Sequence, residues 1–562
     1  MQNLKTLVRA ALFLVCMATS ALAAPFSENI PFTQPDGTAI KLFGEGDEFY
    51  AVFETLDGYT VVFNPLTKSY DYARLAADGS ALISSGVMVG QGDPKKLGVP
   101  KHLRIGSDFI KQQIKGRSQK WDREMGVTTR WKQIKAERQQ ASLHKSTEPA
   151  PALSDSALAT AADTPVLAPP SSTTTGTKVG LTLLIDFDDD PATVPQAEII
   201  DYCNGDNYTG YGNNGSVKKY FQDNSGGLLT YSNVVTVYIR IPNSLHPKSW
   251  YNDTSKDCGD QANLLIKDAI AVMKALPNYA TEIRPAFDGL TADGSGRVLA
   301  CNVFYAGGNG GVWSFGLWPH SWSLYNVDAQ SLGNGKSIYR YQITNIGTSL
   351  ALRTFCHENG HMLCGFPDLY DYDGSSYGGA GSFSLMGNRG SNDANPAQID
   401  AYLKRAAGWA EVVELTSISS LTATLTASTN RFYRYAKPGA ATEYFIIENR
   451  QKTGRDANLA ASGIAIWHVD ELGDRDNESM TPNTTHSNYE LTLVQADNLW
   501  HFQNDIKDDS KDLYYKGNAA SGYSNRFSDF SSPGAYWWDG TSSGVDFRNF
   551  SASAATMTFE VS

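Results

Sequence analysis

The segment that most constrains the fold is a short amphipathic stretch in which two histidines stand four residues apart. Residues 350–362 have the apolar spacing of an α-helix, and Thr348 or Ser349 stands where its N-cap is expected. Side chains at positions i and i+4 project from the same face of a helix, so the rings of His357 and His361 lie one turn apart. The chain must therefore hold a helix with two imidazoles that face a common point.

The residue that follows the first histidine is a glutamate, which could act as a base beside a metal. In the pattern His-Glu-x-x-His, a helix supplies two imidazole ligands to zinc and places a carboxylate beside them. His357 and His361 are the predicted zinc ligands, and Glu358 lies close enough to act as a general base toward a water molecule. With nine histidines in 562 residues, the pattern arises by chance in about one chain in a hundred. The sequence therefore predicts a catalytic zinc site.

The third ligand is expected just after the helix. In the metzincin pattern, a glycine follows the second histidine by three residues and the third ligand follows it by six. Here the glycine and the candidate ligand each come one residue later, at Gly365 and Asp368. A glutamate from a later helix is the rival arrangement, but residues 359–410 contain no glutamate. We predict Asp368 as the third ligand, with Asp371 and Asp373 behind it.

A methionine further along fits the same kind of site. Residues 384–387 predict a tight turn that carries Met386, like the methionine turn below the metal of the metzincins. A methionine outside such a context is usually core filler. Its position after a helix of this kind indicates that it supports the metal site from below.

The segment from His357 to Asp371 resembles the active-site segment of the immune inhibitor A family of secreted bacterial zinc metallopeptidases, which are metzincin-like. Shorter pieces similar to this family lie at 35–38, 318–322, 385–387, 408–409 and 466–471. The resemblance implies a zinc endopeptidase made as a secreted precursor, with an N-terminal prodomain and a β-rich C-terminal region. It also implies that His357 and His361 bind zinc and that Glu358 is the catalytic base.

The N-terminus has the three parts of a secretory signal peptide. Lys5 and Arg9 form a basic start, residues 10–18 are apolar, and residues 21–23 read Ala-Leu-Ala. We therefore expect a secreted, extracellular protein without a membrane anchor. The composition divides the chain into a signal peptide (1–23), a prodomain (24–146), an Ala/Pro/Ser/Thr-rich linker (147–177), a zinc metallopeptidase catalytic domain (178–412) and a C-terminal β-sandwich domain (413–562).

The expected fold class is α+β: a zincin-like metallopeptidase domain, an α+β N-terminal prodomain and an all-β sandwich-like C-terminal domain. Within the prodomain, residues 95–145 contain 14 Lys and Arg against four acidic residues. Their apolar residues are sparse, which predicts exposed helices whose positive charge attracts the acidic remainder. The formal net charge of the whole chain is −12, which argues against a nucleic-acid partner.

The expected partners are protein or peptide substrates, and the chain's own prodomain as an intramolecular inhibitor. Residues 24–202 contain no cysteine, so inhibition cannot use a thiolate on zinc. Structural Ca²⁺ is a second candidate cofactor, at Asp186 and Asp188–Asp190 or at Asp371 and Asp373. The alternative function is a secreted glycan- or protein-binding module with an inactive peptidase-like domain, for which the aromatic residues 536–538 are suited. The intact Glu358 argues against that alternative.

Overall fold

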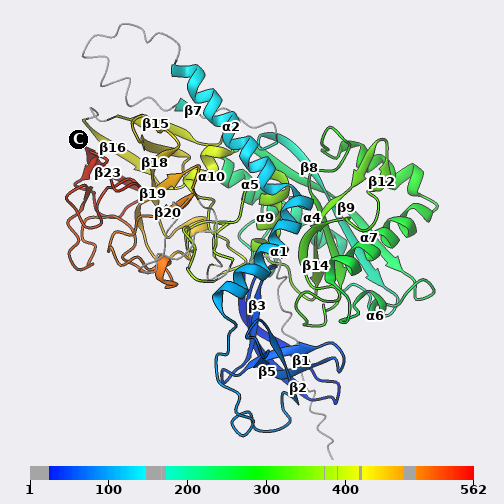
Figure 1. Ribbon diagram of the computed structural model, residues 1–562. Helices are drawn as coiled ribbons and strands as arrows, with labels where there is room; N and C mark the ends of the chain where they lie inside the picture. Colours follow the sequence, from blue (N-terminus) through cyan, green and yellow to red (C-terminus); the bar gives the residue numbers. More distant parts are fainter. Residues whose placement is uncertain are drawn as a thin grey trace, which may run out of the picture.

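The structure is a computed structural model that describes residues 25–146, 166–167, 173–372, 374–388, 390, 392–416, 420–473 and 489–562. The predicted signal peptide and most of the predicted linker lie outside these residues. Figure 1 shows an N-terminal sheet, a central part and a C-terminal part, with α1 and α2 crossing the junction of the last two. None of the helices that the structure describes combines the length and the hydrophobicity needed to span a bilayer.

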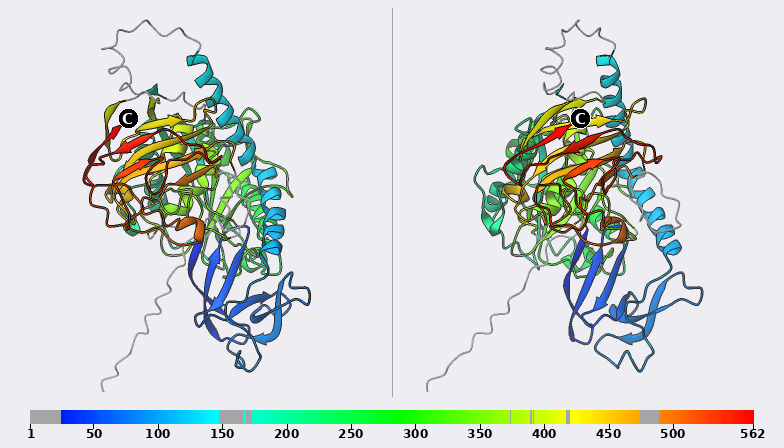
Figure 2. Two further views of the ribbon diagram at one scale, coloured as in Figure 1. Left: turned by 60° about the vertical axis from the view of Figure 1, so that its left-hand side comes forward. Right: turned by 90° about the vertical axis from the view of Figure 1, so that its left-hand side faces the viewer.

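The N-terminal part is a six-stranded antiparallel sheet in which each strand pairs with the next along the chain. Asp57 and Gly58 lie in the turn that joins β3 to β4, where Gly58 has a positive φ. The strands are β1 (Phe26–Thr33), β2 (Ala39–Gly46), β3 (Ala51–Thr55), β4 (Thr60–Asn64), β5 (Ser69–Leu75) and β6 (Leu82–Met88). This sheet projects from the rest of the molecule in both views of Figure 2.

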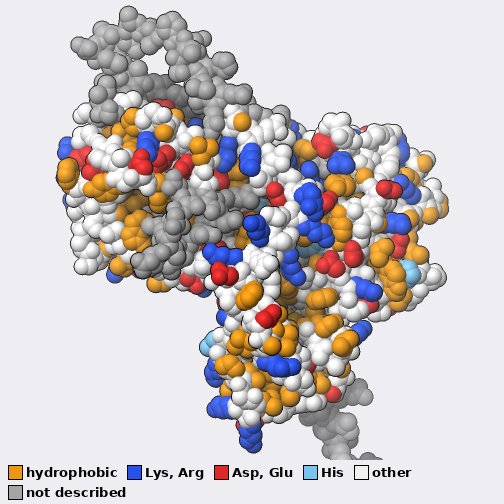
Figure 3. All heavy atoms as spheres, viewed as in Figure 1, with side chains coloured by type: hydrophobic (Ala, Val, Ile, Leu, Met, Phe, Trp, Pro, Cys, Tyr) orange, Lys and Arg blue, Asp and Glu red, His pale blue; other side chains and the backbone are white. Residues whose placement is uncertain are grey.

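Two helices, α1 (Ser107–Met125) and α2 (Val127–Ser146), connect this sheet to the rest of the molecule. The prediction that their apolar residues are exposed is wrong. The buried residues are Ile114, Trp121 and Met125 in α1, with Val127, Trp131 and Ile134 in α2. Their spacing of three, four or seven residues places them on one stripe of each helix, which packs on the central part. Lys and Arg side chains lie on the outer face (Figure 3).

The central part is built on a five-stranded sheet with the order β11-β14-β10-β8-β9. All neighbours are parallel except β11, which is an antiparallel edge strand. The β-prone, apolar run over 178–186 belongs to β8. The strands are β8 (Gly176–Phe187), β9 (Leu229–Ile241), β10 (Cys301–Ala306), β11 (His320–Ser323) and β14 (Arg340–Ile346), with a separate hairpin of β12 (Gln330–Gly333) and β13 (Lys336–Ile338).

Helices cover both faces of this sheet because β8 is apolar on both sides. Leu181, Leu183 and Ile185 share one core with α7 (Cys258–Ala275). Leu184 faces the opposite core, which also holds residues of α4 (Gln196–Asn204), α5 (Val217–Ser225) and α9 (Leu352–Asn359). The helix that carries the two histidines therefore lies on the same face as α4 and α5. All five described cysteines are free thiols.

The C-terminal part is β-rich, as expected, and consists of two sheets that share a core. The rings of Phe445 and Phe527, one from each sheet, lie 5.1 Å apart. One sheet contains β15 (Glu411–Leu415), β17 (Arg431–Ala436), β18 (Glu443–Arg450), β19 (Gly463–Asp470) and β20 (Leu491–Leu493); the other contains β16 (Leu421–Thr426), β21 (Arg526–Ser528), β22 (Asp546–Arg548) and β23 (Thr556–Val561). The short helix α10 (Ala401–Ala406) leads into this part.

The end of the predicted linker belongs to the fold. The two-residue strand β7 (Val166–Leu167) pairs with β15 and extends the first C-terminal sheet. Thr174 is buried, its hydroxyl donates to the carbonyl of Ala407 at 2.6 Å, and the indole of Trp409 donates to its carbonyl at 2.7 Å. Only residues 147–165 and 168–172 of the predicted 147–177 linker therefore lie outside the described structure.

Candidate metal centre

The two histidines stand on a helix that begins and ends differently from the prediction. α9 starts at Leu352, with Ala351 rather than Thr348 or Ser349 at its N-cap. That N-cap offers no side-chain hydrogen bond, and the free N–H of Arg353 instead donates to the carbonyl of Asp393 at 2.9 Å. The carbonyl of Asp393 thus caps the start of the helix, where the sequence predicted a side-chain hydroxyl.

The last turn, η4 (Gly360–Cys364), is a π-helix. A π turn holds one more residue than an α turn. This extra residue explains why the glycine and the candidate ligand come one position later than in the metzincin pattern. Gly365 ends the helix with a φ of 68°, a left-handed conformation that glycine adopts without a steric penalty, so the predicted helix end is confirmed.

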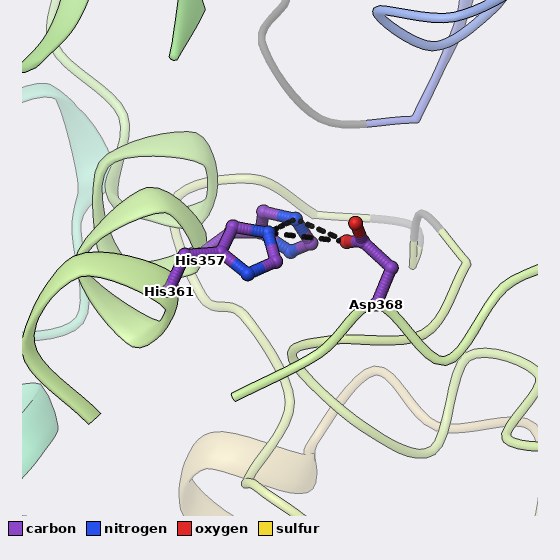
Figure 4. A group of neighbouring side chains, drawn as sticks. All are labelled: His357, His361 and Asp368. Carbon is purple, nitrogen blue, oxygen red and sulfur yellow. Dashed lines mark hydrogen bonds and ion pairs between the residues drawn. The ribbon is translucent and has the colours of Figure 1, made fainter. Parts of the chain in front are cut away.

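The side chains of His357, His361 and Asp368 converge (Figure 4). The Nε2 atoms of the two histidines are 3.2 Å apart, and Oδ1 of Asp368 lies 3.0 Å from Nε2 of His357 and 3.2 Å from Nε2 of His361. A tetrahedral zinc ion with bonds of 2.0–2.1 Å separates its ligand atoms by about 3.3 Å. The three atoms therefore form a triangle of the size that zinc requires.

Backbone carbonyls orient both rings. Nδ1 of His357 lies 3.1 Å from the carbonyl of Leu385, and Nδ1 of His361 lies 2.7 Å from that of Phe366. Each Nδ1 must carry a proton to donate there, which leaves the Nε2 lone pairs directed at Asp368. Acceptors that face one another in a buried site need a cation between them. Without a metal, a proton can fill this place, because the carboxylate of Asp368 raises the pKa of His361 to about 9 although burial lowers it.

Glu358 is fully buried beside this triangle, and neither of its carboxylate oxygens has a hydrogen-bond partner. Burial raises its pKa to about 8. A carboxyl group with a pKa near neutrality can both accept and return a proton. The arrangement offers three ligand atoms and one free carboxylate, which is the set that metal-assisted hydrolysis needs.

The helix that carries the ligands is fixed to the sheet by amides. The side-chain N–H of Asn359 donates to Oδ1 of Asn302 on β10 at 2.8 Å, and the hydroxyl of Tyr231 on β9 donates to Oδ1 of Asn359 at 2.6 Å. These bonds are buried, so they fix the rotation of α9 about its axis. The ring positions of the histidines follow from that rotation.

The predicted tight turn at 384–387 is confirmed, because the N–H of Gly387 donates to the carbonyl of Ser384 at 3.1 Å. Met386 is fully buried and packs on the helix at Gly360, where an added Cβ would lie 2.9 Å from its sulfur. The same turn supplies the Leu385 carbonyl that orients His357. Met386 therefore lies against the helix that presents both histidines.

Residues of the N-terminal part cover the site. The ring of Trp121 packs edge-on against His361 at 5.5 Å, and Phe49 lies between Trp121 and Tyr372 at 5.7 and 4.6 Å. The indole N–H of Trp121 donates to the carbonyl of Ser321 on the edge strand β11 at 2.9 Å. Together with their surroundings they leave His357, Glu358 and His361 without exposed surface.

Glu48, a polar residue of this cover, was not predicted from the sequence to lie at the site. Oε1 of Glu48 is buried without a hydrogen-bond partner, and its Oε2 lies 3.5 Å from the hydroxyl of Tyr370. Burial, followed by the negative charges of Asp368 and Glu358, raises the pKa of Glu48 well above its ordinary value. Glu48 follows Asp47 and precedes two aromatic residues, a pattern with no recognised chemistry, so only the fold places it at the site.

Within the described residues, the expected calcium ligands do not belong to a group that could hold a metal ion. Asp186 pairs with Arg240 at 2.5 Å, and Asp190 pairs with Lys248 at 2.8 Å, so their charges are already compensated. Asp371 accepts hydrogen bonds from Ser376, and Asp373 lies outside the described residues. Within the described part of the chain, the other group that could hold a metal consists of Asp497, His501, Asp509 and Asp512. The sequence analysis did not find it.

No family model matches this chain, and no curated protein matches it significantly. The function must therefore be argued from the site itself.

Proposed function

We propose that this protein is a secreted zinc-dependent endopeptidase that is made as a latent precursor. The observation that carries the proposal is the triangle of two imidazole nitrogens and one carboxylate oxygen, 3.0–3.2 Å apart, beside the unpartnered carboxylate of Glu358. His357, His361 and Asp368 would hold the metal, whose chemistry there is that of a Lewis acid toward water and a peptide carbonyl.

Glu358 moves the protons of the reaction. Its carboxylate takes a proton from the attacking water and returns it to the leaving amine, so the same oxygen serves as base and then as acid. The pKa of about 8 belongs to the covered site, where burial penalises the charge. Removal of the N-terminal cover would admit water and lower this pKa, which favours the basic form at neutral pH.

The edge strand β11 is suited to hold the substrate. No strand among the described residues pairs with its outer edge, and the carbonyl of Ser321 there accepts a hydrogen bond from Trp121 of α1. An extended peptide can add to such an edge through backbone hydrogen bonds, which act independently of its sequence. We expect protein and peptide substrates to bind in this way once Trp121 has left.

The prodomain, residues 24–146, would act as the intramolecular inhibitor by filling the site. Cleavage within 147–165 would release it, since β7 and Thr174 downstream are held by the C-terminal sheet and by Trp409. The signal peptide at 1–23 would direct the precursor out of the cell. Export comes first in this scheme, so the peptidase stays covered until it is outside.

The experiment compares zinc content and proteolysis of three processed proteins after incubation with zinc: the parent, Glu358→Gln and His361→Ala. We expect Glu358→Gln to retain zinc and lose nearly all hydrolysis of casein, on the order of a thousandfold or more, because the base is removed and the ligands remain. His361→Ala should lose both zinc and activity. Near-normal proteolysis by a folded, zinc-loaded Glu358→Gln variant would refute the mechanism.

The binding-module alternative has no specific support. Trp537 is buried in the C-terminal core, where it stacks on Phe445 at 4.9 Å, and Trp538 stacks on His468 at 4.5 Å. Of the three aromatic residues that could form a binding face, only Tyr536 is exposed, at 47%. A single tyrosine does not make an aromatic binding surface.

A further inference from the structure

A second cluster of ligand-type side chains lies far from the first in sequence. Asp497, His501, Asp509 and Asp512 follow β20, and each directs one nitrogen or oxygen to within 4.8 Å of the others. The side chains of Asp497 and Asp512 have no exposed surface, and that of His501 is 12% exposed. The cluster is therefore an internal feature of the C-terminal part.

Two atoms of the cluster are buried and have no hydrogen-bond partner: Oδ2 of Asp497 and Nδ1 of His501. Nδ1 of His501 lies 3.8 Å from Oδ2 of Asp497 and 3.6 Å from Oδ1 of Asp512. These separations exceed a hydrogen bond but suit two ligands on one ion. A buried carboxylate oxygen and a ring nitrogen thus point at a shared space.

Backbone amides orient the carboxylates. The N–H of Leu499 donates to Oδ1 of Asp497 at 3.0 Å, and the N–H of Asp509 donates to Oδ2 of Asp512 at 2.7 Å. The N–H of Lys511 donates to Oδ1 of Asp509 at 2.6 Å. The side-chain N–H of Gln495 also donates to Oδ1 of Asp512 at 2.7 Å, so both oxygens of that carboxylate are held, whereas Oδ2 of Asp497 has no hydrogen-bond partner. These bonds fix the three groups before any ion arrives.

The charge of the cluster is not balanced by protein cations. Within the described residues, no ion pair joins a Lys or Arg side chain to Asp497, Asp509 or Asp512. Carboxylates that are buried together without a cation are strongly destabilising.

We propose that Asp497, His501, Asp509 and Asp512 form a second divalent-metal site. Three carboxylates supply the negative charge, and the imidazole makes the donor set a mixture of oxygen and nitrogen. Such a set suits a first-row ion such as Zn²⁺, whereas Ca²⁺ takes oxygen ligands. We assign the site a structural role, because its residues contact the segment that supports the first site.

The metal would stabilise the segment that supports the methionine turn. Phe502 lies between the ligands, its carbonyl accepts the N–H of Tyr377 at 2.6 Å, and its ring packs on that of Tyr377. The hydroxyl of Ser382 donates to Asp508 at 2.9 Å. These contacts reach the stretch from Tyr377 to Met386, whose Leu385 carbonyl orients His357. A metal at the second cluster would thus stabilise the stretch from Tyr377 to Met386, which supports the first site.

The test uses the full chain with His361→Ala, which removes the first site and any autolysis. After chelation and dialysis, this protein is titrated separately with Zn²⁺, Mn²⁺ and Ca²⁺, with bound metal and melting temperature as readouts. We expect one equivalent of Zn²⁺ per chain and a melting temperature higher by roughly 5 °C. Adding Asp497→Asn and Asp512→Asn should abolish both effects. Asp188→Asn, at an exposed carboxylate elsewhere, is the control.

If the chain binds Ca²⁺ and neither of the other ions, the cluster is still a metal site, but its ligands are the carboxylate oxygens without His501. The proposal is overturned if the His361→Ala chain binds none of the three ions and its melting temperature does not change. The result does not depend on proteolysis, so the second site and the proposed enzyme can fail separately. If the double variant does not fold, the titration of the His361→Ala chain alone still decides.

Discussion

Two regions of the chain cover the segment that carries the candidate zinc ligands, and they treat buried charge in opposite ways. On the C-terminal side, the buried Arg450 donates to both oxygens of Asp456 at 2.7 Å and to the carbonyl of Phe383 at 2.7 Å. On the N-terminal side, Glu48 is buried without a partner for Oε1, and burial raises the pKa of the neighbouring Asp47 to about 7. The N-terminal contact compensates Lys135 with Glu490 but leaves the carboxylate of Glu48 without a partner for Oε1, whereas the C-terminal contact satisfies Arg450 and Asp456 together.

This difference indicates that the C-terminal contact is permanent and the N-terminal one removable. A buried ion pair is costly to break from one side, because the remaining charge is left without compensation. A buried carboxylate without a partner already carries that cost, so its release into water is favourable. The N-terminal cover therefore seals the site through the apolar surfaces of Phe49 and Trp121, while its buried carboxylates Asp47 and Glu48 favour departure. That is the property that a removable inhibitor needs.

The strongest test of the comparison is cleavage between the two regions. A specific protease site placed within 147–165 should raise the activity of the zinc-loaded precursor by a thousandfold or so after cleavage and dilution, since Trp121 and Phe49 then leave the site. The measurement is casein hydrolysis before and after cleavage, with the cleaved Glu358→Gln precursor as the inactive control. An uncleaved precursor with full activity would show that the N-terminal part is no inhibitor.

The next prediction concerns the ion pair of Arg450 and Asp456 on the C-terminal side. Asp456→Ala removes both short bonds of the Arg450 guanidinium to Asp456 and leaves it buried with Glu448 at 3.2 Å, so the free energy of unfolding should fall by about 3 kcal/mol. Denaturant unfolding in the Glu358→Gln background measures it without autolysis. Asp546→Ala is the matched control, because Asp546 pairs with the more exposed Arg526 and should cost less than about 1 kcal/mol. If both variants lose the same free energy of unfolding, the buried pair stabilises the protein no more than the exposed one, and the C-terminal contact is not held by it.

The third effect is a pH dependence of prodomain binding. The ordinary pKa of Asp47 is 3.8, and burial raises it to about 7 in the covered state. The bound form therefore holds a proton that the released form has lost, so binding is strongest below pH 4 and weakens as the pH rises through 7. We expect the affinity of residues 24–146 for the processed Glu358→Gln chain to fall at least tenfold between pH 5 and pH 8.

Calorimetry at a series of pH values measures this affinity. Asp47→Asn keeps the size of the side chain and removes its titration, so the variant should show a flatter profile. A parent profile that is already flat, or that rises with pH, would show that Asp47 is not a source of the release.

The candidate zinc site could be predicted because its ligands lie close together in sequence. His357, His361 and Asp368 span one helix and the turn after it, so local geometry alone brings them together. The start of α9 was missed because its first free N–H is satisfied by Asp393, a residue forty positions away. The π turn at Gly360–Cys364 was also missed, although the one-residue shift of Gly365 and Asp368 is its trace in the sequence.

The contacts between regions could not be predicted in this way. Glu48 reaches the site only through the fold of the N-terminal sheet, and the sequence offers no pattern that joins it to Asp368. The stripe formed by Ile114, Trp121 and Met125 was present in the spacing, but the surrounding Lys and Arg residues suggested an exposed helix. The second cluster spreads over sixteen residues of loop, and without a repeating pattern its four ligands look like solvated polar residues.

The smallest expected effect is that of salt, and it separates charge attraction from apolar packing. The high positive charge of residues 95–145 predicts that ionic strength weakens the binding of the prodomain. The structure instead places Trp121, Trp131 and Ile134 at the contact, with the ion pair of Lys135 and Glu490 largely buried. Buried pairs and apolar surfaces are screened little, so the inhibition constant of residues 24–146 should change less than about threefold between 0.05 and 0.5 M NaCl. Inhibition assays of the processed enzyme at both salt concentrations measure this, with Lys132→Ala, an exposed residue, as the control for Lys135→Ala. A loss of inhibition by more than an order of magnitude at high salt would mean that the exposed basic face, rather than the buried stripe, holds the cover in place.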